Sequence, residues 1–168
     1  MTIRLAINGF GRIGRCVLRA WIESGRKDVE IVAINDLGSA EANAHLLKFD
    51  SVHGRLHADV ALDGNDLVVD GQRIRVTDMR DPTQLPWAGV DVALECTGIF
   101  TDRDKAALHL ENGSDRVLVS APSPGHKLSQ FDEGLLRRPI AKLPLFAVRG
   151  VRRLAPEIIA AKDTWRER

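Results

Sequence analysis

The chain has 168 residues, which suits one domain with a short appendage, and its 44% hydrophobic and 28% charged content is ordinary for a globular protein. No apolar run reaches the length of a membrane span, two cysteines give no disulfide framework, and no secretory leader is visible, so we expect a cytoplasmic location. Residues 1–120 contain 14 Lys and Arg against 18 Asp and Glu, whereas residues 121–168 contain 10 against 5.

The N-terminal segment predicts a strand, a glycine turn and a helix in immediate succession. Residues 3–8 form the apolar strand, residues 9–14 read Gly-Phe-Gly-Arg-Ile-Gly, and an amphipathic helix follows to about Ser24, where Gly25 ends it. This order is the context in which Gly-x-Gly-x-x-Gly indicates dinucleotide binding.

Each glycine of the turn has its own expected part in that binding. Gly9 permits the tight turn, Gly11 lets the backbone approach a pyrophosphate, and Gly14 lets the helix pack close to the strand. The free N–H groups at the positive end of the helix then face the diphosphate.

A second strand, residues 30–35, ends at Asp36, about 20 residues beyond the glycines. A carboxylate at this place accepts hydrogen bonds from the adenosine ribose hydroxyls and repels a 2′-phosphate, which favours NAD over NADP. The alternative is a plain surface aspartate after a strand.

The next segments predict a helix and then an antiparallel insertion at the rim of the sheet. The helix covers residues 40–49, and a polar loop follows at residues 51–55. Three short strands are separated by Asp-Gly pairs typical of hairpins; they are residues 58–62, 67–69 and 73–76.

Strands and helices continue to alternate up to residue 120, which predicts an α/β fold with a Rossmann-type, doubly wound parallel sheet. Residues 90–96 form a strand, Thr101 is the expected N-cap of a helix that Gly113 closes, and residues 117–120 form another strand. Ligands of such sheets bind at the carboxyl ends of the strands. Four polar residues fall there: Asn8, Asp36, Thr97 and Ser120.

The pattern stops after about residue 125. We therefore divide the chain into a dinucleotide-binding domain, residues 1–125, and a basic extension, residues 126–168, which contains no further β-α-β unit. A solvated, poorly ordered tail is the expected state of this extension.

Six motifs in this order closely resemble the NAD-binding half of glyceraldehyde-3-phosphate dehydrogenase, with erythrose-4-phosphate dehydrogenase as a sister family. They are INGFGRIGR (7–15), VAINDL (32–37), LLKFDSVHGR (46–55), RDP (80–82), ECTGIFTD (95–102) and VLVSAP (117–122). The resemblance covers about residues 2–125. It implies an oxidoreductase domain whose cofactor is NAD, in a family that forms homotetramers.

Motif and resemblance together give one set of expected cofactor-binding residues. They are Asn8, Gly9, Phe10, Gly11, Arg12, Ile13, Gly14, Asn35, Asp36, Arg80, Thr97, Gly98, Phe100 and Ser120. The resemblance implies that Arg12 and Ile13 present backbone N–H groups to the pyrophosphate and that Asp36 holds the adenosine ribose.

The resemblance also implies contacts at the two ends of the cofactor. Arg80 would lie near the adenine and Phe100 would flank its ring, while Thr97 and Ser120 would lie near the nicotinamide. The alternatives are a solvated arginine, core packing of the phenylalanine, and ordinary backbone capping at the strand ends.

The catalytic cysteine stretch of that family, Ser-Cys-Thr-Thr-Asn-Cys, does not occur in this sequence. Cys16 and Cys96 are interpreted as small buried hydrophobes, because neither has a partner base in a motif position. No histidine spacing suggests a metal site. We therefore expect no catalytic residue in this chain.

Three hypotheses follow. The first is a sequence of that family cut short, for instance by a frameshift near residue 125, which keeps the NAD site without the catalysis. The second is a non-enzymatic NAD-binding module with a basic interaction tail; nucleic acid and membrane are not expected partners. The third, weaker one is a methyltransferase that uses S-adenosylmethionine.

Overall fold

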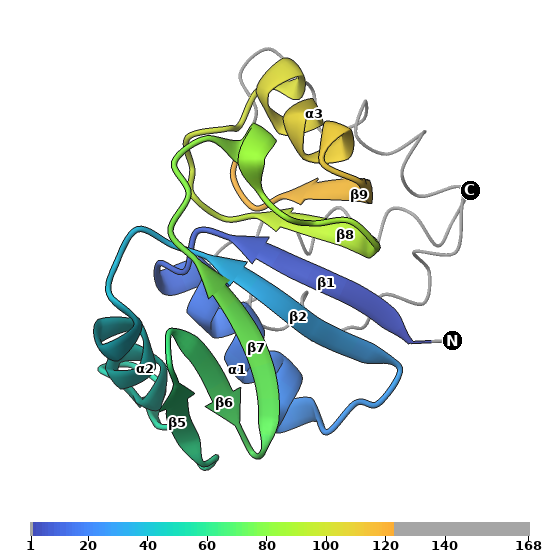
Figure 1. Ribbon diagram of the computed structural model, residues 1–168. Coiled ribbons are helices and arrows are strands. Elements are labelled where there is room, and N and C mark those ends of the chain that lie inside the picture. Colours follow the sequence, from blue (N-terminus) through green and yellow to red (C-terminus); the bar gives the residue numbers. More distant parts are fainter. Residues whose placement is uncertain (1, 123–168) are drawn as a thin grey trace, which may run out of the picture.

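A single seven-stranded sheet with helices on both faces dominates the computed structural model, which describes residues 2–122 (Figure 1). The elements in chain order are β1 (Ile3–Asn8), α1 (Arg12–Ser24), β2 (Val29–Asn35), α2 (Ala40–Lys48), β3 (Phe49–Asp50), β4 (Gly54–Arg55), β5 (Val60–Asp63), β6 (Asp66–Val69), β7 (Gln72–Thr77), the 3₁₀-helix η1 (Pro82–Gln84), β8 (Val90–Glu95), α3 (Arg103–Glu111) and β9 (Ser114–Val119).

The sheet has the order β5-β6-β7-β2-β1-β8-β9, and β3 pairs with β4 separately. Neighbouring strands from β7 through β2, β1 and β8 to β9 are parallel, which confirms the predicted Rossmann-type sheet. The chain leaves β1 toward β2 on one side and later returns to β8 on the other, so the strand order reverses between β1 and β8. A crevice at such a switch point is where doubly wound folds bind their ligands.

The predicted antiparallel insertion is present, and its last strand also joins it to the parallel sheet. β5 and β6 pair antiparallel, but β7 is antiparallel only to β6 and runs parallel to β2 on its other side. Asp70 and Gly71 connect β6 to β7 with φ angles of 48° and 81°, and positive φ at both central residues is the geometry of a type I′ hairpin turn.

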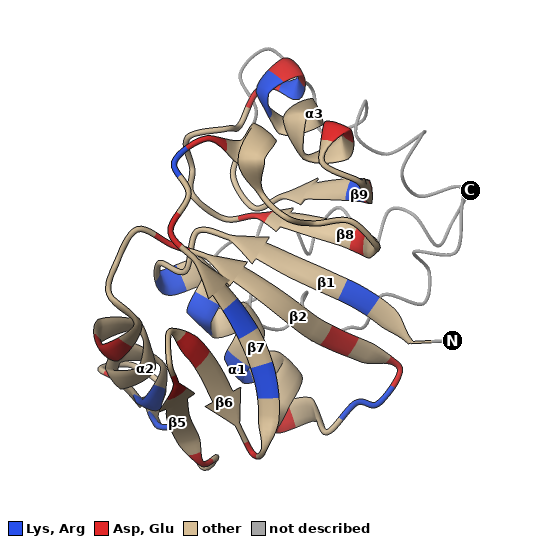
Figure 2. Ribbon diagram, in the orientation of Figure 1, with Lys and Arg blue, Asp and Glu red and all other residues tan. Residues whose placement is uncertain are grey.

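The central strands are buried on both faces because their side chains alternate between two apolar clusters. On β1, Leu5 and Ile7 join the cluster that contains Leu18 of α1, whereas Ala6 joins the cluster that contains Trp87. The large residues on one face of the sheet pack against helix α1. The alanines on the other face leave room for the segment that contains Trp87. Figure 2 agrees, since the middle strands carry few charged residues while both signs are interspersed over helices and loops.

Helix α1 begins where the glycine turn ends. Gly11 is its N-cap in extended conformation, and no side chain within residues 2–122 caps the helix. Gly25 ends it in the left-handed conformation, with φ of 62°, as the sequence predicts. The N–H groups of the first turn of α1 are therefore available at the carboxyl edge of the sheet.

Several predicted boundaries are wrong by one or two residues. Helix α2 ends at Lys48, and Phe49 begins the short strand β3 that pairs with β4, so the predicted polar loop is partly strand. The N-cap of α3 is Asp102, whose Oδ1 accepts the N–H of Lys105 at 3.0 Å, and not Thr101. The proposed extension, residues 126–168, lies outside the described residues.

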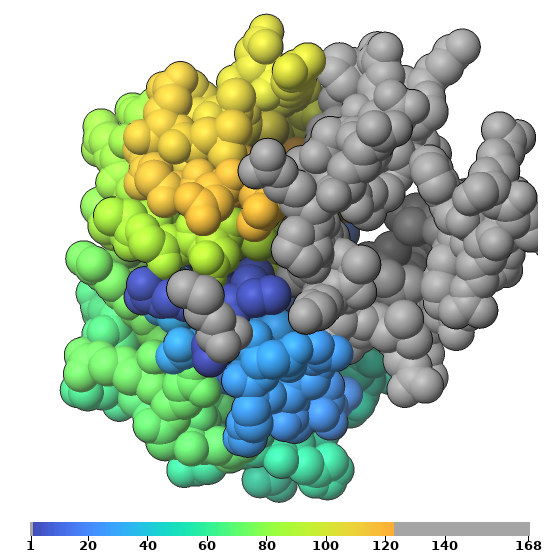
Figure 3. Space-filling view, turned by 90° about the vertical axis from the view of Figure 1, so that its right-hand side faces the viewer, coloured from blue at the N-terminus to red at the C-terminus, as the bar shows by residue number. Residues whose placement is uncertain are grey.

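The opposite edge of the sheet is built from strand starts and the turns that precede them. Figure 3 shows this side, where the start of β1 lies between the turn before β2 and the segments that open β8 and β9. Arg4 joins them, because its backbone N–H donates to Oδ2 of Asp91 and its guanidinium to the carbonyl of Gly89. The polar motif residues are gathered at the other edge, the carboxyl edge.

Candidate functional site

The carboxyl edge brings together the four strand-end residues that the sequence predicts. Asn8 ends β1, while Asp36, Thr97 and Ser120 follow β2, β8 and β9 within two residues. Backbone hydrogen bonds continue the sheet beyond the strands: the N–H of Gly9 donates to the carbonyl of Asn35 at 2.8 Å, and that of Cys96 to Asn8 at 2.7 Å.

The glycine turn has one open position and two crowded ones. A Cβ on Gly9, whose φ is 90°, would lie 2.6 Å from the backbone nitrogen of Thr97, and one on Gly14 would lie 2.3 Å from the carbonyl oxygen of Gly9. A Cβ on Gly11 would meet no described atom within 4 Å. Gly9 and Gly14 are therefore required by the fold, whereas among residues 2–122 no atom occupies the space directly over Gly11.

The carboxylate of Asp36 ties the glycine turn to the loop after β2. Its Oδ2 accepts the backbone N–H of Phe10 at 2.7 Å, and its Oδ1 accepts the N–H of Gly38 at 2.9 Å and the amide of Asn43 at 3.4 Å. Each carboxylate oxygen has two acceptor positions, so Oδ2 keeps one for a further donor. The half-buried side chain of Asp36 therefore holds two segments of the fold together while one acceptor position remains for a ligand.

Arg12 is held beside the turn by Asp50, the last residue of β3, which the sequence motifs did not single out. One guanidinium nitrogen lies 3.5 Å from Oδ1 of Asp50. That carboxylate also accepts the backbone N–H groups of His53 and Val52, each at 2.8 Å. These hydrogen bonds, and to a smaller extent the charge of Arg12, hold the pKa of Asp50 well below its usual range.

Asn8 and Asn35 lie beneath the surface of the edge, 2% and 4% exposed. Nδ2 of Asn35 donates to Oδ1 of Asn8 at 2.8 Å, and Oδ1 of Asn35 accepts the N–H of Met79 at 2.8 Å. Nδ2 of Asn8 donates to the buried Glu95 carboxylate at 2.7 Å. Their amide groups therefore build the floor of the site.

The residues predicted around the adenine occupy different environments. Arg80 is exposed on the segment after β7, at the carboxyl edge. Phe100 is half-buried and packs edge-on against His109, with ring centroids 6.4 Å apart. Leu37 and Ile99, which the sequence analysis did not assign, are 55% and 69% exposed on the loops after β2 and β8. An apolar residue one or two positions after Asp36 and Thr97 was the available signal.

Neither cysteine is set up as a nucleophile. Burial raises the pKa of Cys16 and raises the pKa of the Cys96 thiol to about 11. The hydroxyl of Ser120 lies beside the Cys96 thiol and acts on its pKa in the opposite direction, but more weakly than burial. Within residues 2–122, no group of three or more His, Cys, Asp and Glu side chains is arranged to hold a metal ion.

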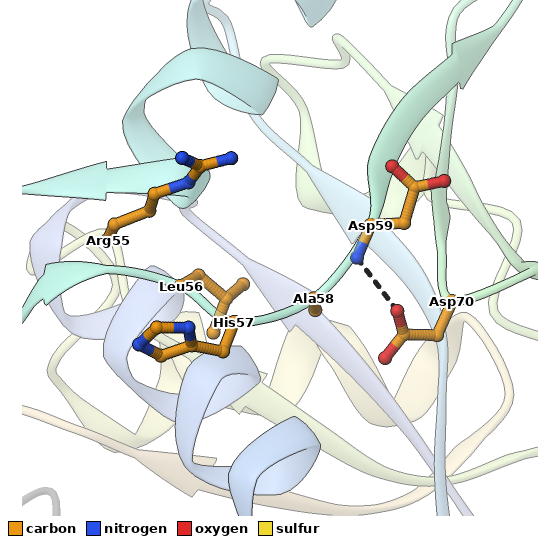
Figure 4. Close-up of a pocket in the computed structure, with 6 residues that line it drawn as sticks. All are labelled: Arg55, Leu56, His57, Ala58, Asp59 and Asp70. Carbon is orange, nitrogen blue, oxygen red and sulfur yellow. Dashed lines mark hydrogen bonds between the residues drawn. The ribbon is translucent and has the colours of Figure 1, made fainter.

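A separate hollow of about 410 Å³ lies away from the strand-end residues (Figure 4). It is lined by Arg55, Leu56, His57, Ala58, Asp59 and Asp70. One side is closed by the backbone N–H of Asp59, which donates to Oδ1 of Asp70 at 2.8 Å. In Figure 4 the ring of His57 points away from Asp59 and Asp70, and the guanidinium of Arg55 lies well apart from both carboxylates, so the cations and carboxylates do not converge on one ligand position.

Residues 3–103 match the family model described as the NAD-binding domain of glyceraldehyde 3-phosphate dehydrogenase. The chain belongs to this family. The matched segment contains the glycine turn, Asp36 and the loop after β8, and the resemblance stated from the six motifs is confirmed.

Curated glyceraldehyde-3-phosphate dehydrogenases are similar over a slightly longer segment. The chain is 67% identical over 126 residues to the enzyme of Cereibacter sphaeroides and 61% identical over 131 residues to that of Xanthobacter flavus. Against the enzyme of Geobacillus stearothermophilus it is 51% identical over 131 residues. These alignments cover 74 to 77% of this chain.

The chain matches 38 to 39% of the length of these dehydrogenases. It therefore represents the NAD-binding half of a glyceraldehyde-3-phosphate dehydrogenase-like oxidoreductase, and NAD is the cofactor of this domain family. In the described segment of this domain, no helix has both the length and the apolar character needed to cross a bilayer.

Proposed function

We propose that the carboxyl edge binds NAD with its diphosphate over Gly11. The observation that carries this proposal is the open space above Gly11 combined with the uncapped first turn of α1. The backbone N–H groups of Arg12 and Ile13 are the proposed donors, and the positive end of the helix favours the negative charge of a diphosphate. Gly9 and Gly14 bring turn, strand and helix close enough to form the cradle.

Asp36 is the proposed partner of the adenosine ribose. Its Oδ2 has an acceptor position left beside the hydrogen bond from Phe10, and a ribose hydroxyl is the matching donor. A 2′-phosphate placed there would face the carboxylate, so NAD is preferred over NADP.

The other predicted residues are proposed to line the two ends of the cofactor. Leu37 and Ile99 expose apolar surface on the loops after β2 and β8, which suits the faces of the adenine, with Arg80 at its edge. Thr97 and Gly98 on the loop after β8, and Ser120 after β9, lie toward the nicotinamide. Phe100 packs against His109 and so supports the loop after β8 from the protein interior. Asn8 and Asn35 support the glycine turn through their hydrogen-bonded amides.

We infer that this domain serves NAD-dependent, phosphorylating oxidation of an aldehyde, as the activity of the whole protein. Bound NAD supplies the hydride acceptor, and the described residues bind and orient it. The raised pKa values of Cys16 and Cys96 support placing the nucleophile elsewhere than on these two cysteines. A homotetramer in the cytoplasm is the proposed assembly and location, with neither nucleic acid nor membrane as a partner.

Calorimetric titration of the purified chain with NAD tests the proposal. NADP and S-adenosylmethionine are titrated in parallel for comparison. We expect saturable binding of NAD, weaker binding of NADP and none of S-adenosylmethionine. Absence of both heat and thermal shift at millimolar NAD would contradict the binding proposal. Preference for S-adenosylmethionine would favour the methyltransferase hypothesis instead.

A further inference from the structure

Glu95 ends β8 as a buried carboxylate, 1% exposed, surrounded by hydrogen-bond donors. Oε1 accepts the backbone N–H of Thr97 at 2.8 Å and also the Thr97 hydroxyl. Oε2 accepts Nδ2 of Asn8 at 2.7 Å and lies 2.8 Å from Nε2 of His109. Each oxygen thus has two partners, which compensates for the loss of water around a buried carboxylate.

This carboxylate connects the two walls of the proposed cofactor site. Asn8 leads directly into the glycine turn, and Thr97 opens the loop after β8. The walls also touch one another, because Gly9 packs so tightly on the Thr97 backbone that no Cβ fits between them. A displacement of Thr97 is therefore a displacement of the surface against which the turn is packed.

His109 fixes the carboxylate from the side of α3. Its ring is fully buried and stacks on Trp87, with centroids 4.9 Å apart and an interplanar angle of 18°. Phe100 covers it edge-on. The aromatic rings leave little freedom for the imidazole to follow a moving carboxylate, so Glu95 has a rigid support.

We propose that Glu95 is a positioning residue for NAD binding, which sets the Thr97 side of the site and hence the nicotinamide half of the cofactor. It acts through Thr97 and Asn8, since it is buried and does not reach the surface of the site. The adenosine half depends on Asp36 and the loop after β2, with Ile99 as the residue that the loop after β8 adds, and no hydrogen bond of the Glu95 carboxylate in the described structure reaches Asp36 or Ile99. This inference rests on the proposed NAD binding.

The substitution Glu95→Gln tests the proposal because it keeps the size of the side chain and replaces one acceptor oxygen by a donor. If the oxygen of Gln at position 95 faces Thr97, its NH₂ group faces the NH₂ group of Asn8, and two donors meet. If the side chain is turned by about 180°, its NH₂ group faces the backbone N–H of Thr97 instead. Either way the Asn8 amide or the Thr97 N–H loses its acceptor, and the second partner of that oxygen, His109 Nε2 or the Thr97 hydroxyl, keeps a hydrogen bond only by accepting instead of donating. We expect affinity for NAD to fall about tenfold, with affinity for AMP within about twofold of the original value.

A compensating substitution separates positioning from general damage. In the double variant Glu95→Gln and Asn8→Asp, the amide introduced at position 95 donates to the carboxylate introduced at position 8, which still accepts Nδ2 of Asn35. The amide oxygen at position 95 then returns to Thr97, and the buried negative charge is moved but not removed. We expect this pair to restore NAD affinity to within about threefold, whereas Asn8→Asp alone weakens NAD binding because it places two carboxylates side by side.

Asp66→Asn is the matched control for lost stability. Asp66 accepts the N–H of Val76 at 2.9 Å and the guanidinium of Arg73 at 2.8 Å, and its strand β6 is separated from β1 by β7 and β2. Its loss should lower the melting temperature without changing the ratio of NAD to AMP affinity.

All variants are measured in the full chain by calorimetry with NAD and with AMP, alongside thermal denaturation. If the original chain binds neither nucleotide, the proposed function fails. If it binds both and Glu95→Gln changes both affinities equally or neither, the positioning role is overturned. If Glu95→Gln does not fold, the double variant Glu95→Gln and Asn8→Asp decides. A folded double variant whose NAD affinity is restored supports the positioning role, and any other result overturns it.

Discussion

The backbone N–H of Phe10 donates a 2.7 Å hydrogen bond to Oδ2 of Asp36, across 26 positions of sequence. The carboxylate proposed to hold the ribose is thus also the group that fastens the glycine turn to the loop after β2. Recognition of the sugar and the shape of the diphosphate cradle are coupled through one side chain, so a substitution there changes both.

Asp36→Asn is expected to weaken NAD binding about tenfold and to lower the free energy of unfolding by about 1–2 kcal/mol. An amide cannot accept at both of its polar atoms, so either Phe10 or Gly38 loses its acceptor. Removing the negative charge also removes repulsion of a 2′-phosphate, so the ratio of NAD to NADP affinity should fall. Calorimetry with both cofactors checks this, and an unchanged ratio would refute the ribose assignment.

Gly11→Ala should reduce NAD affinity at least tenfold while costing less than about 1 kcal/mol of stability. The added methyl group meets no described atom in the folded chain but occupies the space proposed for the diphosphate. Urea denaturation and calorimetry on the same sample separate the two effects. A variant that binds NAD normally would place the diphosphate elsewhere.

Gly9→Ala should have the opposite signature, a large loss of stability of about 3 kcal/mol or more. Its methyl group would lie 2.6 Å from the Thr97 nitrogen and 2.8 Å from the Cys96 carbonyl carbon, on a residue with φ of 90°. Urea denaturation beside Gly11→Ala provides the comparison. Equal stability of the two variants would contradict the crowding seen at the turn.

Asp50→Asn should destabilise the fold at neutral pH by about 1–2 kcal/mol, and the difference from the original chain should shrink in acid. Hydrogen bonds from the His53 and Val52 N–H groups lower the pKa of Asp50 in the folded state. Its contribution is therefore complete above the unfolded pKa of about 4, and is lost as the pH falls toward the folded pKa. Urea denaturation over the range from neutral to strongly acidic pH measures this.

The exposed Asp115 of β9 offers a matched control for that series. Asp115→Asn removes a carboxylate of the same chemistry that has no turn built on it among the described residues. A stability difference for Asp50→Asn that does not depend on pH, or that grows in acid, would count against the hydrogen-bonded carboxylate as its cause.

Cys96 should react slowly with iodoacetamide in the folded chain. Burial raises the pKa of its thiol to about 11, so in mildly alkaline buffer the reactive thiolate is about a hundredfold scarcer than for an ordinary cysteine. The Cys16→Ala background isolates this thiol. Mass spectrometry of labelling with and without urea should show at least tenfold faster modification in urea, and equal rates would argue against burial of the thiol.

The glycine turn, Asp36 and the strand-helix alternation could be predicted from the sequence alone, because they depend on local rules. Glycine spacing fixes a turn, apolar periodicity fixes strands and helices, and parallel strands bring their carboxyl ends to one edge. The family model over residues 3–103 supports the same interpretation. The predicted strand ends near Asn8 and Asp36 agree with the structure within one residue.

The partners of Glu95 could not be read in this way, because they come from β1, from the loop after β8 and from α3. Sequence spacing says nothing about which donor meets a carboxylate 87 or 14 positions away, as Asn8 and His109 do. For the same reason the sequence does not predict the crowding at Gly9, which comes from the Thr97 backbone. Nor does it predict that β7 pairs in parallel with β2, because the two strands are brought together only in the folded chain. Local chemistry identifies what the edge can bind, while packing between distant segments determines which side chains remain available to bind it.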